Sequence, residues 1–152
     1  MPAKGDRTVL LTRKAWYALI AVKHLAEQQP SENSFSAKDL ADLYGFPQEA
    51  LAKILQRLAR AGLLLSHHGI RGGYTLVRDP HQVSVLDVIK ASEEVTRDGI
   101  HGKHWRDLEY LPGYRQLRMV SEIVEDALRR VTIADLKEQA SGSSDSRDAQ
   151  HC

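Results

Sequence analysis

The sequence has almost no cysteine and no long apolar run, and both absences narrow the class of protein. Its single cysteine, Cys152, has no partner for an internal disulfide, which favours a reducing compartment over secretion. The longest apolar run, residues 15–22, is far shorter than the roughly 18 to 20 residues that a membrane helix needs. The first residues are polar, and Arg13 and Lys14 end the short apolar patch that follows, so we expect no signal peptide. These features predict a cytoplasmic protein without a membrane span.

Net charge is nearly absent as well, because 21 basic and 20 acidic residues leave a formal charge of +1 at pH 7. The 42% hydrophobic and 27% charged residues are typical of a folded globular chain, and 152 residues suffice for one domain with an added arm or tail. The distribution of charge is more informative. No acidic residue occurs between Lys53 and Arg71, a segment that also holds Arg57, Arg60 and two histidines. This local basic face predicts a phosphate-binding surface, whereas a merely solvated helix face, the alternative, usually mixes both signs.

Catalytic and nucleotide-binding motifs are also missing. The sequence contains no recognisable Ser-His-Asp triad, catalytic carboxylate pair or Gly-Lys-Ser phosphate loop. The densest glycine cluster, residues 67–73, lies between two predicted strands, whereas a nucleotide-binding loop lies between a strand and a helix. We therefore expect no enzyme activity.

Capping residues and apolar spacing predict two helices at the start of the chain. Thr12 is placed as the N-cap of a first helix that ends near Gln29, before a polar loop. Ser36 is placed as the N-cap of a second, short helix over residues 37–44, and Asp39 completes a Ser-x-x-acid capping box.

A third helix follows after a short break. Gly45 ends the second helix, and Pro47 is suited to open the next one, over about residues 47–61, because its ring presets the backbone of a first turn. Gly62 is placed to end it in a left-handed conformation. Two helices joined by a short glycine-containing turn, with the second helix basic, predict a helix-turn-helix.

A glycine-rich hairpin comes directly after this motif. Residues 63–66 and 74–77 have the pattern of two short strands, and three glycines lie in the connection, residues 67–73. Such a hairpin beside a helix-turn-helix predicts a wing, whose backbone can approach DNA closely while basic side chains bind it.

The second half of the chain is predicted to contain three more helices. Ser84 is placed to cap residues 85–92, and Thr132 to cap a short helix that ends near residue 138. Between them, residues 114–130 carry an apolar seam that predicts packing against a second copy of the chain, with folding back on the same chain as the alternative: Leu117, Val120, Val124, Ala127, Leu128 and then Val131. The predicted division is a DNA-binding domain at 1–92, a loop at 93–113, a dimerisation helix and short helix at 114–138, and a disordered tail at 139–152.

Five short blocks, in this order, are similar to one family of bacterial regulators. They are LTRKAWYAL (11–19), KILQRLARAGL (53–63), GIRGGYTL (69–76), VSVLDVI (83–89) and VTIADL (131–136). On these blocks the chain resembles the Rrf-type winged helix-turn-helix transcription regulators, the IscR/NsrR-like family, over about residues 11–136. The resemblance implies a mainly α fold, a winged helix-turn-helix with a small β-hairpin wing and a long C-terminal dimerisation helix. It also implies a homodimer, commonly a repressor, that binds a palindromic operator in double-stranded DNA.

The resemblance also implies which residues contact DNA. By position they are, for base edges, Gln48, Glu49, Ala52 and Lys53, and, for phosphates, Gln56 and Arg57. The alternative for Gln48 and Glu49 is a solvated first turn, which the helix dipole favours for a glutamate. The family's wing commonly begins Arg-Gly-Pro-Gly-Gly-Gly-Tyr, where this chain has His-Gly-Ile-Arg-Gly-Gly-Tyr. We therefore expect Arg71 to contact the minor groove, with His68 contributing less because a neutral imidazole attracts phosphate weakly.

Many relatives in the resembled family hold an iron-sulfur cluster on three cysteines of the loop that corresponds to residues 93–113, and this loop has no cysteine. Because cluster iron needs thiolate ligands, we do not carry the cluster over and expect no cofactor. His101 and His104 form a His-x-x-His pair in the loop, with carboxylates available to complete a metal site at Glu93, Glu94, Asp98 and Asp107. A plain solvated loop is the other interpretation, since a closed zinc site needs four ligands of defined geometry.

Two further functions stay open from the sequence alone. A winged helix can serve only as a protein-interaction module, in which case the basic face is incidental. The chain can also be a regulator that senses a metal or small ligand through the His101/His104 loop. Binding to DNA that weakens steeply as salt rises would separate the DNA-binding function from the first alternative.

Overall fold

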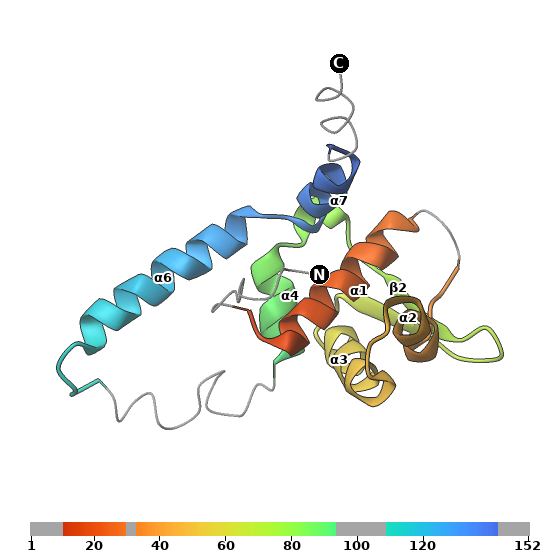
Figure 1. The fold of residues 1–152 in the computed structure, drawn as a ribbon, viewed down its shortest axis with the longest axis horizontal. Helices are drawn as coiled ribbons and strands as arrows, with labels where there is room; N and C mark the ends of the chain where they lie inside the picture. Colours follow the sequence, from red (N-terminus) through yellow and green to blue (C-terminus); the bar gives the residue numbers. More distant parts are fainter. Residues whose placement is uncertain (1–10, 30–32, 94–108, 143–152) are drawn as a thin grey trace, which may run out of the picture.

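The computed structural model describes residues 11–29, 33–93 and 109–142, which form a mainly helical body with two projections (Figure 1). Its elements are α1 (Arg13–Glu27), α2 (Ala37–Tyr44), α3 (Gln48–Arg60), β1 (Leu64–His67), β2 (Gly73–Leu76), the 3-10 helix η1 (Pro80–Gln82), α4 (Val85–Ser92), α6 (Tyr114–Arg130) and α7 (Ile133–Gly142). The two strands pair antiparallel, with Leu64 opposite Leu76 and His67 opposite Gly73. The predicted mainly α winged helix-turn-helix fold is confirmed. The described helices include none with the length and apolar content of a membrane span.

Helices α1 and α2 begin at their predicted capping residues. The Thr12 hydroxyl accepts a hydrogen bond from the backbone N–H of Ala15 at 3.1 Å, which satisfies a free donor at the start of α1. At the start of α2, Ser36 and Asp39 form the predicted capping box, with reciprocal bonds of 3.1 and 2.8 Å. Gly45 ends α2 in the left-handed region, at a φ of 72°.

Three boundaries differ slightly from the sequence prediction. Pro47 is the N-cap of α3, with an extended ψ of 119°, so the helix begins one residue later than predicted. Its carbonyl still accepts the first helical hydrogen bond, from Leu51 N–H at 3.0 Å. The wing strands are offset by one residue, because the pairing includes His67 and Gly73. Helix α7 continues to Gly142, so residues 139–142 of the predicted tail are helical, as the helix propensity of Gln and Ala allows, while 143–152 lie outside the described residues.

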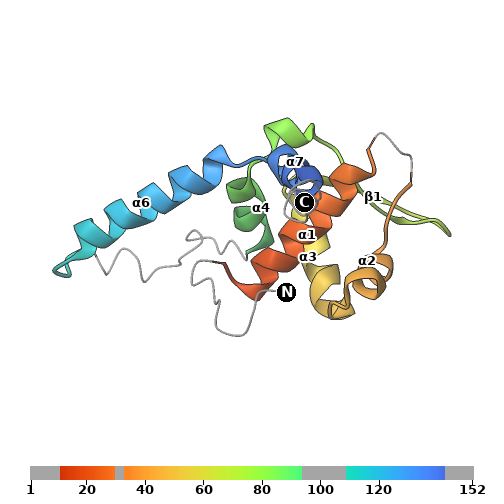
Figure 2. The ribbon, with the colours of Figure 1, turned by 45° about the horizontal axis from the view of Figure 1, so that its top comes forward.

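The core lies between α1, α3, α4 and the first turn of α7. Helix α1 crosses the centre and packs against α3, α4, α7 and β2, and Figure 2 shows α4 and α7 beside it. Small side chains such as Ala18 and Ala21 let the neighbouring helices approach α1 closely. The largest fully buried side chains come mainly from α2, α3 and α7: Leu40, Leu51, Ile54, Leu55, Leu58 and Ile133.

The chain returns to this core after α6 through a short backbone pairing. Val85 N–H donates to the Val131 carbonyl at 2.8 Å, and Ile133 N–H donates to the Val83 carbonyl at 2.9 Å. Thr132 then caps α7 through a capping box with Asp135. This pairing holds the start of α7 against the start of α4. The chain therefore leaves the body after α4 and returns to the same body at Val131.

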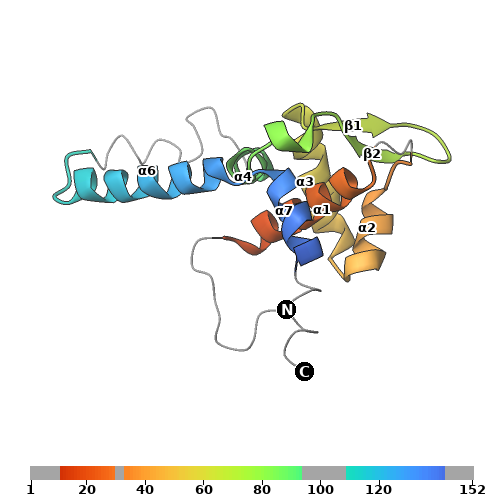
Figure 3. The ribbon, with the colours of Figure 1, turned by 90° about the horizontal axis from the view of Figure 1, so that it is seen from above.

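Helix α6 projects from the body and contains no buried residue. Figure 3 shows it extending from the end of the body opposite to the hairpin. Its last turns touch the described body, where Leu128 packs against the core and Lys90 pairs with Glu125 at 3.5 Å. What covers the rest of the apolar seam, a second copy or the same chain, therefore stays a prediction.

Candidate nucleic-acid interface

Helix α3 has two distinct faces because its apolar residues repeat at intervals of three and four. Four large apolar side chains of α3 are fully buried, and they anchor the helix in the core: Leu51, Ile54, Leu55 and Leu58. The opposite side, here called the recognition face, consists of exposed Gln48, Glu49, Lys53 and Gln56 with half-buried Ala52 among them. The structure therefore brings five of the predicted DNA-contacting positions onto one surface. Exposed Arg60, which the sequence placed in the basic segment but not among the individual DNA contacts, extends this face at its C-terminal end.

The turn before α3 is held by a cluster of aromatic side chains. Phe46 lies 4.4 Å from Tyr17 and 5.5 Å from Tyr44, measured between ring centroids. The Tyr44 hydroxyl lies 2.8 Å from Nδ1 of His24 in α1, so a hydrogen bond joins the end of α2 to α1. Burial raises the pKa of Tyr44, and the negative charge of Glu27 adds to this shift, so the phenol stays protonated near neutral pH. These contacts fix the angle at which α2 presents α3.

Arg57 differs from the other predicted contacts on α3. Its side chain is half-buried, and its Nη1 donates to the backbone carbonyl of Ser92 at 3.1 Å. Ser92 is the last residue of α4 and is itself buried. The guanidinium therefore joins the recognition helix to α4 and satisfies a carbonyl at the end of that helix. Sequence spacing gave no sign of this contact, because the two residues lie 35 positions apart.

The wing consists of β1, β2 and the tip between them, residues 68–72. Gly72 N–H donates to the Gly69 carbonyl at 2.9 Å, which closes a tight turn, and Gly69 has a φ of 111° that favours glycine. His68 and Arg71 are both exposed at this tip, as the sequence predicted. His67, in contrast, is engaged with Thr75 through a hydrogen bond of 2.9 Å.

The wing is attached to the loop before α2, a connection that sequence reasoning missed. Phe35 and Tyr74 exchange two backbone hydrogen bonds, of 3.1 and 2.8 Å, so the loop pairs with β2 as a single-residue bridge. The Ser34 hydroxyl donates to the Arg71 carbonyl at 2.6 Å. Because both contacts run from the helix-turn-helix to the hairpin, the wing is held in a fixed position beside it.

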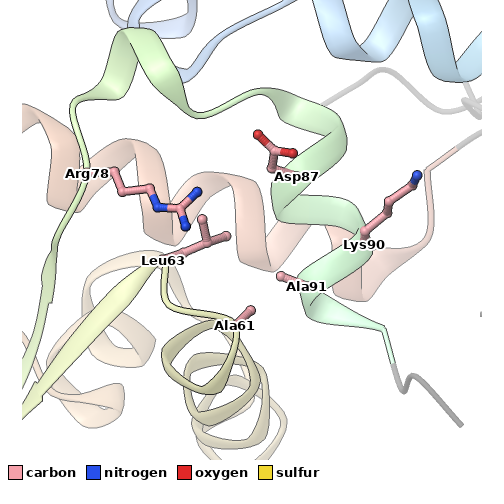
Figure 4. A pocket seen from close by; sticks show the side chains of 6 residues that line it. All are labelled: Ala61, Leu63, Arg78, Asp87, Lys90 and Ala91. Atoms are coloured by element: carbon pink, nitrogen blue, oxygen red, sulfur yellow. The ribbon is translucent and has the colours of Figure 1, made fainter. Parts of the chain in front are cut away.

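A shallow pocket lies between the end of α3 and one side of α4, lined by Ala61, Leu63, Arg78, Asp87, Lys90 and Ala91. Figure 4 shows Arg78 reaching over Leu63 toward this hollow. Two of its charged groups already have partners, since Asp87 caps α4 through Ser84 and Lys90 pairs with Glu125. The pocket therefore offers chiefly the Arg78 guanidinium to a solute.

The predicted metal candidates His101 and His104 lie outside the described residues. Within the part of the chain that is described, no group of three or more His, Cys, Asp or Glu side chains is placed to hold a metal ion.

Comparison with known proteins agrees with this geometry. The model of the Rrf2 family, described as iron-dependent transcriptional regulators, matches residues 11–139. A protein of Synechocystis named as an HTH-type transcriptional regulator is 35% identical over 130 residues, covering 83% of this chain and 86% of its own length. BadM of Rhodopseudomonas palustris, also named as such a regulator, is 33% identical over 126 residues, covering 83% and 80%.

Solved structures show the same fold. The T. potens IscR structure superposes with a TM-score of 0.66 at 25% identity and covers 93% of this chain and 91% of its own. The B. subtilis CymR structure, titled the global cysteine regulator, has a TM-score of 0.65 at 24% identity, covering 87% and 98%. The family model spans nearly all described residues, and the relatives are matched over most of both chains. These matches establish the family. The chain belongs to the Rrf2 family and is a helix-turn-helix transcription regulator that binds DNA.

Proposed function

We propose that this regulator is a cytoplasmic homodimeric repressor that recognises a palindromic operator, with α3 in the major groove and the wing in the minor groove. The observation that carries the proposal is the exposure of the predicted contacts. One face of α3 is completely buried, whereas Gln48, Glu49, Lys53 and Gln56 on the opposite face are free to meet DNA. A helix anchored in this way enters the major groove as a rigid element.

The residues have different roles in the proposed complex. Gln48, Glu49, Ala52 and Lys53 lie in the first half of α3, the part of a recognition helix that meets base edges. Gln56 and Arg57 lie further along and are assigned to phosphates, although Arg57 shares its guanidinium with the Ser92 carbonyl.

The wing completes the proposed interface. Arg71 lies at its tip and is assigned to the minor groove, where a guanidinium is attracted by the negative potential of narrow, A·T-rich segments. His68 lies in the same tip, which contains no acidic residue, and is assigned to a nearby phosphate.

A homodimer follows from the chemistry of α6. The exposed apolar side chains of this helix lie mainly at the spacing of a packing seam and need a covering surface, and a second copy of the same helix offers a self-complementary one. Two heads would then place two α3 helices about 34 Å apart, or a multiple of that distance, on one side of DNA. A dimer bound in this way covers its operator, which is the physical basis for proposing repression.

The family's description as iron-dependent raises the question of a cluster site. The chain has one cysteine, Cys152, which lies outside the described residues, and one thiolate cannot provide the three cysteine ligands that a cluster of the resembled type requires. The donor set of this chain therefore does not fit a cysteine-ligated iron-sulfur cluster. We propose that its DNA binding is regulated in another way.

Selection from a random DNA pool, followed by a salt titration, tests the proposed function. The full chain should enrich a palindromic sequence, and its affinity for that duplex should fall steeply between about 50 and 200 mM salt, as expected when cationic side chains displace counterions from phosphates. A reporter gene placed behind the selected sequence should be expressed less when the protein is present. Failure to enrich any sequence, or affinity insensitive to salt, would contradict the proposal and favour a protein-interaction module.

A further inference from the structure

The tip of the wing presents a large apolar side chain to solvent. Ile70 is 107% exposed, the highest value among the exposed large hydrophobic residues of the described chain. Single exposed apolar residues are common on protein surfaces. This one lies next to Arg71 in the connection between β1 and β2, and Figure 3 shows that hairpin extending away from the body.

The backbone holds Ile70 in one position. It follows Gly69 in the tight turn that the Gly72 N–H to Gly69 carbonyl bond closes at 2.9 Å. The turn is compact at Gly72, since a Cβ there would lie 2.8 Å from the His67 carbonyl oxygen. The Ser34 hydroxyl holds the next peptide through the Arg71 carbonyl at 2.6 Å. Ile70 and Arg71 are therefore presented together as adjacent side chains on a backbone that loses little freedom on binding.

The fold itself does not account for an isoleucine at this place. Tight turns favour Gly, Pro, Asn, Asp and Ser, which stabilise the turn backbone, and a β-branched apolar side chain supplies none of these effects. Because Ile70 is fully exposed, it also adds nothing to the hydrophobic core. The Ile70 side chain is therefore suited to contact an apolar surface of a binding partner that the wing tip reaches.

We propose that Ile70 is an apolar wedge that enters the minor groove beside Arg71 and partly unstacks a base step there. This inference rests on the proposed DNA-binding function and names a specificity-determining residue within it. Isoleucine is one of the side chains that minor-groove proteins insert between base pairs, and Arg71 supplies the neighbouring charge that draws the tip into the groove. Pyrimidine–purine steps unstack most easily, so the wedge selects TA or CA steps at the position that the tip reaches.

The test compares Ile70→Ala with Arg71→Ala on two duplexes of equal length: the sequence that the wild-type protein selects from a random pool, and a scrambled version of it. Ile70→Ala should weaken binding to the selected duplex by about tenfold, the range expected for one lost base step. Binding to the scrambled duplex should change by less than about twofold, and the salt dependence should be unchanged, because no phosphate contact is lost. Arg71→Ala should instead weaken binding to both duplexes and reduce the salt slope by about one.

Two controls separate the wedge from damage to the hairpin. Val77→Ala removes an apolar side chain that is 56% exposed at the base of the same hairpin, and it should leave both affinities unchanged. Ile70→Leu keeps an apolar side chain at the tip and should restore most of the affinity and the preference for the flexible step. A repeated selection with Ile70→Ala should show no preference at that step. A 2-aminopurine base placed at the step should become more fluorescent when the wild-type protein binds and unstacks it, and this rise should be absent with Ile70→Ala.

The possible outcomes are distinct. If the wild-type protein selects DNA but Ile70→Ala has the same affinity and the same base preference, the wedge is refuted while the proposed function stands. Equal losses on both duplexes would show that Ile70 only supports the turn, which also refutes the wedge. Loss of repression in cells with unchanged DNA binding would assign Ile70 to a protein partner instead. If the wild-type protein selects no sequence, the proposed function itself fails.

Discussion

Lys53 lies near the middle of the recognition face, exposed and four residues after Glu49. A lysine at this place can donate to a guanine edge as well as attract phosphate. We predict that Lys53→Ala weakens binding to the selected operator by about tenfold and relaxes the preference for one base pair. Quantitative binding to single-base variants of the operator measures both effects. Arg118→Ala, which removes the same charge from the projecting helix α6, should change neither.

Arg57 combines a structural role with its predicted phosphate contact. Its hydrogen bond to the Ser92 carbonyl joins α3 to α4. We predict that Arg57→Gln lowers the free energy of unfolding by about 1 to 2 kcal/mol, because a partly buried carbonyl loses a charged donor. Chemical denaturation measures this loss, and Gln56→Ala on the neighbouring exposed position is the control. Unchanged stability together with a large loss of DNA affinity would show instead that Arg57 acts only on DNA.

Spacing along α3 was sufficient to predict which of its side chains face outward, because helix geometry fixes that pattern once the buried positions are known. It was not sufficient for Arg57, whose partner depends on how α4 packs against α3, a property of the tertiary structure. The attachment of the Arg71 carbonyl to Ser34 was missed for the same reason.

The wing depends on a close backbone contact at Gly73. A Cβ built on this residue would lie 2.5 Å from the Phe35 carbonyl carbon, in the bridge that attaches β2 to the loop before α2. We predict that Gly73→Ala separates these two segments and lowers both the melting temperature and the affinity for the operator. Thermal unfolding and DNA binding measure the two effects. Ser66→Ala, an exposed change on the paired strand, should preserve both properties, and a wild-type-like Gly73→Ala protein would show that the bridge is dispensable.

Helix α2 is stabilised by a carboxylate whose contribution depends on pH. Hydrogen bonds from the backbone and side chain of Ser36 hold the pKa of Asp39 below its ordinary value of 3.8. A lowered folded-state pKa means that the carboxylate stabilises the fold above pH 3.8, and that this contribution is lost as the pH falls through the lower folded value. We predict that Asp39→Asn is less stable than the wild type at pH 7 and that the difference shrinks below pH 3.8. Urea denaturation of both proteins at pH 7 and below pH 3.8 measures this difference in stability. An equal difference at the two pH values would exclude a charge-dependent cap.

Elements were predicted best where the signal is local. The N-caps at Thr12, Ser36, Ser84 and Thr132 all occur as predicted, because a capping side chain acts within three residues of its own position. The predicted strand boundaries differ from the structure by one residue, since the register of a hairpin depends on the pairing of two strands. The bridge between Ser84 and Thr132 had no sequence signal, because it forms only after α6 returns the chain to the body.

At the scale of the molecule, the wing and α6 extend from opposite ends of one core (Figures 1 and 3). The sequence predicted an apolar seam on α6 but left open what covers it. The structure shows that the body covers little of this helix, and it adds Met119 and Ile123 to the exposed apolar side chains. A helix of this length gains little stability alone in water, so it needs a packing partner.

The proposed partner is a second copy of α6, and a double substitution tests it. Val120 and Ile123 are 58% and 66% exposed and lie on the seam side of the helix. We predict that Val120→Glu with Ile123→Glu yields a monomer, because facing carboxylates would repel one another across the seam. Sedimentation velocity measures the association state. Since one head then binds without the other, affinity for the palindrome should fall by about a hundredfold or more.

The matched control exchanges charges on the opposite side of α6. Arg118 and Glu122 form an exposed ion pair at 3.2 Å, and Arg118→Glu with Glu122→Arg keeps that pair while altering as many residues. This variant should remain a dimer with wild-type affinity for the operator. A Val120→Glu, Ile123→Glu protein that still sediments as a dimer would place the interface elsewhere. One that is monomeric but binds the palindrome normally would show that dimerisation is not needed for recognition, because each head would then supply enough binding energy alone.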